Sequence, residues 1–425
     1  MSPRIRVATV VTRMTAGAGG VALRGALALD PTRYDVTIIA GGAGFDGHNS
    51  YDDAAGILVG TQAVLGAPAG DLLAAAEVAG LGVVRVPSLV SPIAPWRDRA
   101  ALQTLTSYLR AQRYDVVHTH SAKAGALGRM AASRAGVPRI VHTYHGFPFH
   151  DYQSALRRQS YIAMERWLGK RTDAILAVGS AVAADAARLK LISPERICTI
   201  SPAVDPIGYQ SGTSPRGLAR RRLELAPGAR VVGTIGRVDY QKAPEQWVDA
   251  LAEVATDDIW GVWIGDGPLR EKLLARVRRR GLTDRFLFLG HREDATALLP
   301  AFDVFMLASR YEGLPCVLVE AMQAHVPIVA TAVNAVQDLV IPGVSGVLVP
   351  PGEPTLLARS VAHLLDHPTA ARRMADAAYA GLGDRFSPHA LGVLLDHTYR
   401  RDIPRATTGS RPAPLPRRSM QWTSP

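Results

Sequence analysis

The chain has 425 residues, a mass of 45.4 kDa and 48% hydrophobic residues, so it can bury a substantial core and divide into two domains. Its formal net charge of +11 favours a polyanionic partner, such as a nucleotide, a nucleic acid or an anionic membrane. The two cysteines, Cys198 and Cys316, are too few for a disulfide framework and lack the spacing of a zinc site, which favours a reducing compartment.

The apolar segment 4–11 is the first predicted strand, because it is too short to span a membrane and passes directly into a glycine-rich turn. No uninterrupted apolar stretch approaches about 20 residues, so we expect no transmembrane anchor. Further β-rich runs alternate with helical patterns, which predicts an α/β protein with parallel sheets covered by helices. These strands are predicted at 36–40, 83–86, 116–118, 140–143, 174–178, 230–235, 260–264, 286–289, 304–307, 327–330 and 346–349.

Prolines and glycines cluster at 201–214, which we interpret as a linker between two series of strands. The sequence therefore predicts an N-terminal α/β domain at 1–205 and a C-terminal α/β domain at 206–387, both Rossmann-like. Ligands of such doubly wound sheets bind at the carboxyl ends of the strands, so we expect chemistry in an interdomain cleft. A helix at 388–401 is expected to pack back on the first domain, and 402–425 is predicted to be a disordered, basic, proline-rich tail.

Glu312 and Glu320 bracket a short apolar run that is the most informative segment of the sequence. A glycine and Pro315 predict a loop followed by the first helical turn, so the amides of Cys316 and Val317 would face an anion at the positive end of a helix. The two carboxylates, about two turns apart, would then surround a polyhydroxylated ligand. The alternative is that Glu312 caps the helix and Glu320 is a solvated surface residue.

Two cations follow the predicted strand at 230–235 and its glycine turn. Arg237 and Lys242 emerge together there and could clamp a diphosphate, the first as a planar fork and the second as a point charge. Surface charges on a turn are the alternative. Gly265 and Asp266 lie in the turn after the next predicted strand. Such a turn often has no role in binding a ligand.

The N-terminal half offers two further candidate sites. Gly19 and Gly20 follow the first strand and would let a phosphate or sugar approach the backbone, although the third glycine of a dinucleotide fingerprint is missing. His142, His145 and His150 close a strand, where successive side chains diverge and no carboxylate lies among them, so contact with a sugar or phosphate is favoured over a metal. The chain has no Asp-x-Asp motif to hold Mg²⁺ on a nucleotide-sugar diphosphate, so we expect neither a metal nor another cofactor.

The segment from Leu156 to Arg171 mixes basic and apolar residues and could contact an anionic membrane. A solvated helix packed on its own domain is the alternative. The other basic residues are scattered and are not interleaved with stacking aromatics, which argues against nucleic-acid binding.

Taken in order, these motifs resemble the retaining GT-B glycosyltransferases of family 4, also described as glycosyl transferases group 1. The resemblance runs from about residue 4 to about residue 401 and includes His145-Gly146 and the segment 345–352. It implies two Rossmann-like domains and metal-independent transfer of a sugar from a nucleotide diphosphate sugar to a hydroxyl, with retention of the anomeric configuration.

The resemblance also implies a role for each motif residue. Arg237 and Lys242 would hold the donor diphosphate, Glu320 the ribose hydroxyls and Glu312 the hydroxyls of the sugar. His145 would lie beside the anomeric carbon. The other donor-binding positions that it implies are Gly19, Gly20, Gly265, Asp266, Leu314, Cys316 and Val317. Two departures from the family pattern are Ala243, where a glycine is common, and the segment 333–338, which replaces a glycine pair and leaves the donor sugar open.

The surroundings of Lys123 and His145 resemble transferases that build cell-surface polysaccharides on lipid carriers. We therefore expect a glycan or lipid-linked acceptor from a cell-envelope pathway, and a cytoplasmic enzyme that contacts the inner face of the membrane. Two alternatives remain: a nucleotide-sugar epimerase or hydrolase of GT-B fold, and a non-catalytic scaffold that binds nucleotide sugars.

Overall fold

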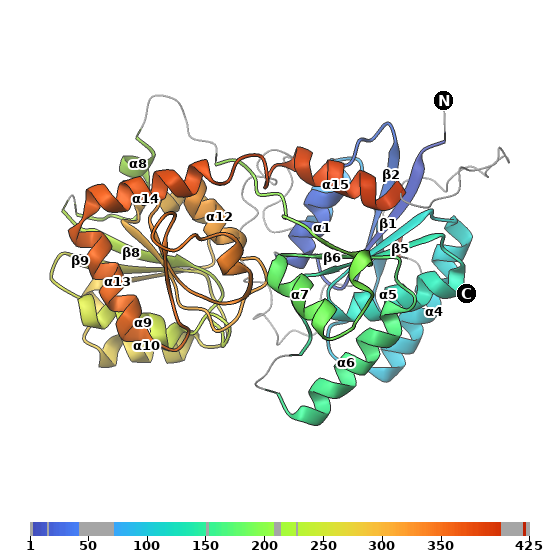
Figure 1. The fold of residues 1–425 in the computed structure, drawn as a ribbon, viewed down its shortest axis with the longest axis horizontal. Coiled ribbons are helices and arrows are strands. Elements are labelled where there is room, and N and C mark those ends of the chain that lie inside the picture. Colours follow the sequence, from blue (N-terminus) through green and yellow to red (C-terminus); the bar gives the residue numbers. More distant parts are fainter. Residues whose placement is uncertain are drawn as a thin grey trace. The chain divides into compact units, whose positions relative to one another are not determined.

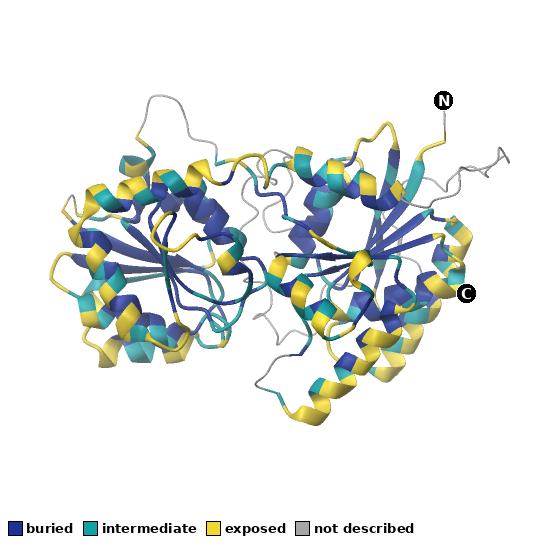
Figure 2. Ribbon diagram, viewed as in Figure 1, coloured by how far each residue is buried: buried dark blue, intermediate teal, exposed yellow. Residues whose placement is uncertain are grey.

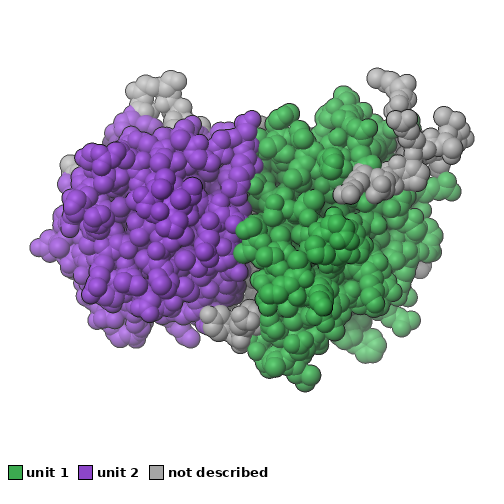
Figure 3. All heavy atoms as spheres, viewed as in Figure 1, with its two compact units in different colours: residues 1–48, 65–203, 387–425 green, residues 49–64, 204–386 purple. Residues whose placement is uncertain are grey.

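The computed structural model describes residues 3–14, 17–41, 72–149, 153–207, 214–226, 228–400 and 420–421. These residues form two compact units, shown in green and purple in Figure 3. Unit 1 comprises the described residues of 1–48, 65–203 and 387–425, and unit 2 those of 204–386. The sequence placed the boundaries at 205/206 and 387/388. Part of the expected linker, 208–213, lies outside the described residues.

Unit 1 is built on a parallel sheet with the strand order β14-β3-β2-β1-β4-β5-β6-β7 (Figure 1). Its strands are β1 (Ile5–Val11), β2 (Tyr34–Gly41), β3 (Gly82–Val86), β4 (Val116–His120), β5 (Arg139–Tyr144), β6 (Ala174–Ala177), β7 (Ile197–Thr199) and β14 (Met420–Gln421). The inner strands are buried along their whole length, because helices cover both faces of the sheet (Figure 2). Such strands are continuous apolar runs, as the sequence predicted.

The helices of unit 1 follow the strands in alternation. They are α1 (Ala18–Leu27), α3 (Leu72–Val78), α4 (Pro95–Gln112), α5 (Ala122–Ala135), α6 (Ala155–Gly169), α7 (Ser180–Arg188) and α15 (Pro388–Arg400), with a 3-10 turn η1 (Pro194–Arg196). The helix α15 returns from the end of the second series and packs against α1 within unit 1. The predicted tail lies outside the described residues except for β14, which pairs with Val84 and Arg85 of β3. The prediction of disorder is therefore wrong at the two residues of β14, Met420 and Gln421.

A buried ion pair joins α5 to α6. Two oxygens of Glu165 accept from Nη2 of Arg129 at 2.8 and 3.0 Å, and both side chains are at most 1% exposed. The hydroxyl of Tyr144 at the end of β5 donates to the same carboxylate at 2.7 Å. Because a buried charge is costly unless it is paired and hydrogen-bonded, this network fixes one face of α6 to the domain.

Unit 2 has a second parallel sheet, with the strand order β10-β9-β8-β11-β12-β13. Its strands are β8 (Arg230–Ile235), β9 (Ile259–Ile264), β10 (Phe286–Gly290), β11 (Val304–Leu307), β12 (Ile328–Thr331) and β13 (Val347–Val349). Its helices are α8 (Pro215–Arg222), α9 (Pro244–Val254), α10 (Arg270–Arg279), α11 (Ala295–Leu298), α12 (Cys316–Gln323), α13 (Pro354–Asp366) and α14 (Pro368–Ala380), with 3-10 turns η2 (Thr283–Arg285), η3 (Leu299–Ala301) and η4 (Asn334–Asp338).

Two tryptophans centre the core of unit 2. Trp247 of α9 and Trp263 of β9 are at most 1% exposed and meet edge to face at 5.5 Å. Each indole N–H donates to a backbone oxygen, that of Trp247 to Met306 and that of Trp263 to Gly236, both at 3.0 Å. The core therefore contacts the turn after β8 directly.

All the predicted strands are present, and the α/β prediction is confirmed. The sequence missed β7, because it is a three-residue edge strand with little burial and gives almost no periodic pattern. The prediction that Pro315 lies in the first helical turn is wrong by one position: Pro315 is the residue before α12, with ψ at 95°, and Cys316 begins the helix. No described helix is both long enough and apolar enough to cross a bilayer.

Candidate active site

The carboxylate of Glu312 is held by three side chains in the loops that follow β8 and β11. The ammonium of Lys242 and the hydroxyl of Ser309 each donate to Oε1 at 2.6 Å, and the Gln241 side-chain amide donates to Oε2 at 3.0 Å. The backbone N–H of Glu312 donates to Oδ1 of Asn334, after β12, at 3.1 Å. Because these parallel strands are neighbours, their carboxyl ends share one edge of the sheet, and Glu312 is fixed there.

Asp239 organises the two cations that the sequence selected. One of its oxygens lies 2.6 Å from the guanidinium of Arg237, and the other accepts from the backbone N–H of Lys242 at 3.1 Å. Arg237 thus pairs with Asp239, whereas Lys242 pairs with Glu312. Each cation already has a carboxylate partner, a balance that the sequence analysis did not foresee.

The turns after β8 and β9 are packed backbone against backbone. A Cβ on Gly265, whose φ is 127°, would lie 2.1 Å from the carbonyl oxygen of Gly236. One on Gly267 would lie 2.6 Å from the carbonyl oxygen of Val238. The carboxylate of Asp266 accepts from the N–H of Gly267 at 2.7 Å and from Arg270 at 3.1 Å. The Gly265-Asp266 turn therefore supports the turn that carries Arg237.

The start of α12 lies four residues after Glu312. Leu314 and Val317 are buried and Cys316 is partly buried, so the first turn of this helix is packed against unit 2. Glu320, in the second turn, is only 4% exposed. Both structural alternatives are therefore wrong: Glu320 is not a solvated surface residue, and no side-chain cap bonds the helix start.

Unit 1 contributes a cluster of histidines from β4 and the end of β5. Period-two alternation sends His118, His120 and His145 to one face, and His142 to the other, where a Cβ on Gly125 of α5 would lie 2.5 Å from the His142 ring. Nε2 of His145 lies 3.1 Å from Nδ1 of His120. The His118 ring lies 4.2 Å from that of His120.

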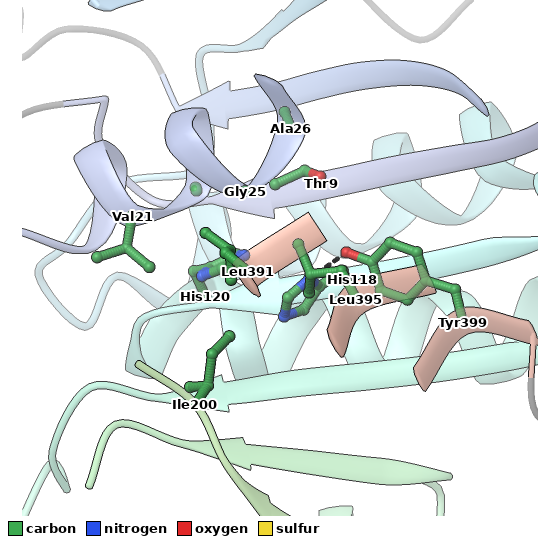
Figure 4. A pocket seen from close by; sticks show the side chains of 11 residues that line it. Thr9, Val21, Gly25, Ala26, His118, His120, Ile200, Leu391, Leu395 and Tyr399 are labelled. Carbon is green, nitrogen blue, oxygen red and sulfur yellow. Dashed lines mark hydrogen bonds between the residues drawn. The ribbon is translucent and has the colours of Figure 1, made fainter. Parts of the chain in front are cut away.

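Tyr399 and Thr143 fix the His118 ring. Its Nδ1 lies 2.6 Å from the hydroxyl of Tyr399 on α15, drawn in Figure 4, and its Nε2 lies 2.7 Å from that of Thr143. Burial is the main cause that lowers the pKa of each histidine in the cluster, to about 3 for His118 and about 4 for His145, and well below the usual value for His120 and His142. The cluster is therefore uncharged at neutral pH.

Gly19 and Gly20 are buried in the first turn of α1. A Cβ on Gly19 would lie 2.9 Å from the backbone oxygen of Arg13. Close packing of the loop after β1 onto α1 therefore requires a glycine at this position, whether or not a ligand is present. Within the described ranges, no group of three or more His, Cys, Asp or Glu side chains is placed to hold a metal ion.

Comparison with known proteins identifies the family. Residues 216–381 match the family model for glycosyl transferases group 1, and residues 16–207 match that for glycosyltransferase family 4. The 2-deoxystreptamine glucosyltransferase of Streptomyces kanamyceticus is 31% identical over 331 residues, which cover 74% of this chain and 85% of that protein. The chain belongs to glycosyltransferase family 4.

A second relative and two solved structures also resemble this glycosyltransferase. The UDP-Gal:alpha-D-GlcNAc-diphosphoundecaprenol alpha-1,3-galactosyltransferase of Escherichia coli is 31% identical over 60% of this chain and 67% of that protein. Anabaena Alr3699/HepE, solved with UDP and glucose, has a TM-score of 0.76 at 20% identity and covers 93% of this chain and 99% of that one. WaaG, a glycosyltransferase involved in lipopolysaccharide biosynthesis, has a TM-score of 0.70 at 17% identity, with coverage of 93% and 100%. These likenesses show the fold and confirm the predicted GT-B class.

The structure of the glycosyltransferase adds residues that the sequence analysis missed. Gln241, Ser309 and Asn334 hold Glu312, and Asp239 holds Arg237. Their positions directly after strands were a usable signal, but their types are common in turns. His120 was missed because it lies 25 residues before His145 and reaches it only through strand pairing.

Replacing Gly265 by alanine should destabilise unit 2 and weaken donor binding. The added methyl would collide with the Gly236 carbonyl, which also accepts from Trp263. We expect a loss of more than about 3 kcal/mol of unfolding free energy in urea titrations. The matched control is Gly281→Ala, at φ 68° with no atom within 4 Å, which should cost only about 1 to 2 kcal/mol. Equal costs at the two positions would contradict the packing argument.

The buried histidines should make the protein acid-sensitive. Their folded pKa values lie below the usual 6.5, so stability is complete above about pH 6.5 and falls as the unfolded chain takes up protons that the folded chain excludes. For each such histidine the loss between pH 7.5 and 5.5 is about 1.4 kcal/mol, and it ends only below about pH 3 to 4. Urea unfolding at these two pH values should show a total loss above about 2 kcal/mol, unchanged in the exposed-site control His397→Gln. Stability independent of pH over this interval would rule out a neutral cluster.

Proposed function

We propose that this glycosyltransferase moves a sugar from a nucleotide diphosphate sugar to a hydroxyl, with retention of configuration and without a bound metal. The observation that carries the proposal is the oriented carboxylate of Glu312, held by Lys242, Gln241 and Ser309 at the shared edge of β8, β11 and β12 and just before the amino end of α12. Oε1 of Glu312 accepts two hydrogen bonds and Oε2 only one, so Oε2 keeps a lone pair for a hydroxyl of a sugar.

The surroundings of Glu312 suit a departing diphosphate. Breaking a glycosyl–phosphate bond places negative charge on the leaving group, which the amino end of α12 and the guanidinium of Arg237 would stabilise more in the transition state than in the ground state. Because Lys242 already pairs with Glu312, we assign it to orienting this carboxylate while its positive charge faces the phosphates. Glu320, buried on α12, would bind the ribose hydroxyls.

The family resemblance implies that His145 would lie beside the anomeric carbon of the donor. The burial-lowered pKa of His145 makes it a neutral hydrogen-bonding group at pH 7. A glycoside hydrolase of the same fold fits less well, because two carboxylates that flank a bond need no accompanying Arg and Lys beside a helix start. Detection of a glycosylated acceptor would exclude a non-catalytic scaffold.

For the acceptor we propose a lipid-linked or other cell-envelope polysaccharide precursor, used at the inner face of the membrane in the cytoplasm. The E. coli relative is named for a diphosphoundecaprenol acceptor, which supports this class. The exposed side of α6 supports it as well, since Leu156 is 84% exposed and Trp167 is 43% exposed and lies under the guanidinium of Arg171. The buried side of α6 carries Glu165, so packing on the domain and contact with lipid use different faces.

Removing Lys242 or Glu320 should weaken binding of the donor. We expect Lys242→Ala and Glu320→Ala each to raise the Kd for the preferred nucleotide sugar at least about tenfold, because each removes a charged partner worth about 1.5 to 3 kcal/mol. Calorimetric titration with a panel of UDP-, GDP- and ADP-sugars, with a chelator present, measures this. Lys272→Ala, an exposed lysine on α10, is the control.

Four results would each contradict one part of this proposal. No binding to any member of the panel would reject it, loss of transfer with the chelator would reject metal independence, and an inverted product in the proton NMR spectrum would reject retention. Equal binding by Lys242→Ala and the control would remove Lys242 from the site.

Contact with an anionic membrane should depend on the outer face of α6. In flotation with vesicles of phosphatidylglycerol and phosphatidylcholine, we expect the double variant Leu156→Glu, Trp167→Glu to lose most of its bound fraction. The substitutions remove apolar side chains that would be buried in the bilayer and add charges that the anionic lipid repels. The control Val393→Glu changes an apolar residue of similar exposure on α15 and should float like the unmodified protein. Equal flotation of the double variant would exclude α6 as the contact.

A further inference from the structure

His120 contacts His145 within unit 1. Its ring is 3% exposed at the end of β4, and its Nδ1 is 3.1 Å from Nε2 of His145. The register of the two strands sets this contact, since His120 is opposite Thr143, two positions before His145. Its other nitrogen, Nε2, is buried and has no hydrogen-bond partner among the described residues.

The unpartnered nitrogen belongs to a ring that lines a small cavity in the interior of unit 1. Figure 4 shows His120 and His118 between α1 and α15, with apolar side chains of Val21, Leu391 and Leu395 around them. The cavity has a volume of about 10 Å³, near the minimum for a single water molecule. A polar atom left without a hydrogen bond in such a place lowers stability, so packing alone does not explain a histidine at this position.

The proton in the contact between His120 and His145 has two possible positions. If His145 donates from Nε2 to Nδ1 of His120, the single ring proton of His120 is on its own Nε2, as an N–H without a protein acceptor in an apolar cavity. If His120 donates from Nδ1, its Nε2 carries only a lone pair there, and His145 keeps its proton on Nδ1. Buried N–H groups without an acceptor are the rarer case, so the second arrangement is favoured.

We propose that His120 is a positioning residue for sugar transfer: its Nδ1–H donates to Nε2 of His145, which fixes that ring and leaves an N–H on Nδ1 of His145 as a donor to an oxygen of the bound sugar. The proposal rests on the proposed function, because it acts through His145. Nδ1 of His145 has no protein partner among the described residues, and the ring is only partly buried, so a ligand can reach it.

The arrangement decides what His145 does in the reaction. With Nε2 occupied by His120 and the proton on Nδ1, the ring has no lone pair left to remove a proton from an acceptor hydroxyl. It acts as a fixed neutral donor, and the burial that lowers the pKa of both rings keeps it in this form at neutral pH. The hydroxyl proton of the acceptor then leaves with another base, such as the departing diphosphate.

The tautomer of His145 can be measured without substrate. In protein labelled with ¹⁵N-histidine, long-range ¹⁵N–¹H correlation distinguishes a protonated ring nitrogen from a bare one, and loss of the signal in His145→Ala assigns the ring. We expect the proton on Nδ1 of His145 and on Nδ1 of His120 at pH 7. A proton on Nε2 of His145 would overturn the proposal.

Kinetics of His120 variants test the role in transfer. His120→Phe keeps the ring shape but removes both nitrogens, so kcat should fall at least about tenfold while the KM for the donor changes less than about threefold. Its midpoint of thermal unfolding should be equal or higher, because the unpaired buried nitrogen is gone. His120→Asn places an amide N–H near the former Nδ1 and should recover most of kcat.

Thr143→Val is the matched control. It removes the hydroxyl bonded to His118 in the same buried cluster but leaves the contact between His120 and His145, so kcat should be retained. Full kcat in His120→Phe, or an equal loss in Thr143→Val, would reject the positioning role. If the unmodified protein transfers no sugar from any donor, the proposed function is wrong. The NMR measurement tests the tautomer of His145 independently of that result.

Discussion

The ion pair between Lys242 and Glu312 is the interaction on which the candidate site of unit 2 depends. It joins loops 70 residues apart in the chain, after β8 and β11, at a distance of 2.6 Å and with little exposure. A carboxylate and an ammonium that are mostly removed from water need each other and further hydrogen bonds, which Ser309 and Gln241 supply. The pair therefore both orients the group that would bind the sugar and fastens two loops at the carboxyl edge of the parallel sheet.

The two cations proposed to bind a donor diphosphate are already paired with carboxylates. The sequence presents Arg237 and Lys242 as two cations available to phosphate, but the structure gives each a carboxylate partner, Asp239 and Glu312. The positive field left over in this region comes from the amino end of α12, whose backbone dipoles need no counter-ion. Preorganised dipoles of this kind stabilise charge that develops during the reaction without reorganisation, which agrees with a role in leaving-group departure.

Unit 1 uses the opposite electrostatic means. The clustered rings of His118, His120 and His145 carry no charge because burial lowers their pKa values. Hydroxyls of Tyr399 and Thr143 hold His118, and His120 contacts His145. Neutral rings can define direction without adding charge beside a sugar, whereas unit 2 combines ion pairs with a helix dipole. The return of α15 to unit 1 supplies Tyr399 and one wall of the cavity beneath His120, so the end of the described chain helps to shape its first domain.

The sequence by itself determined the two parallel sheets, the family, and the positions of Glu312, Glu320, Arg237, Lys242 and His145 after or near strand ends. These properties are local: apolar periodicity sets the elements, and glycine turns mark where strands stop. Only the tertiary structure decided the partners. Lys242 meets Glu312, and His120 meets His145, because β8 lies beside β11 and β4 beside β5 in a particular register. Strand order and register arise from packing of the whole domain, so spacing along the chain cannot give them, and neither the matched charges of unit 2 nor the unpaired nitrogen of His120 could be foreseen.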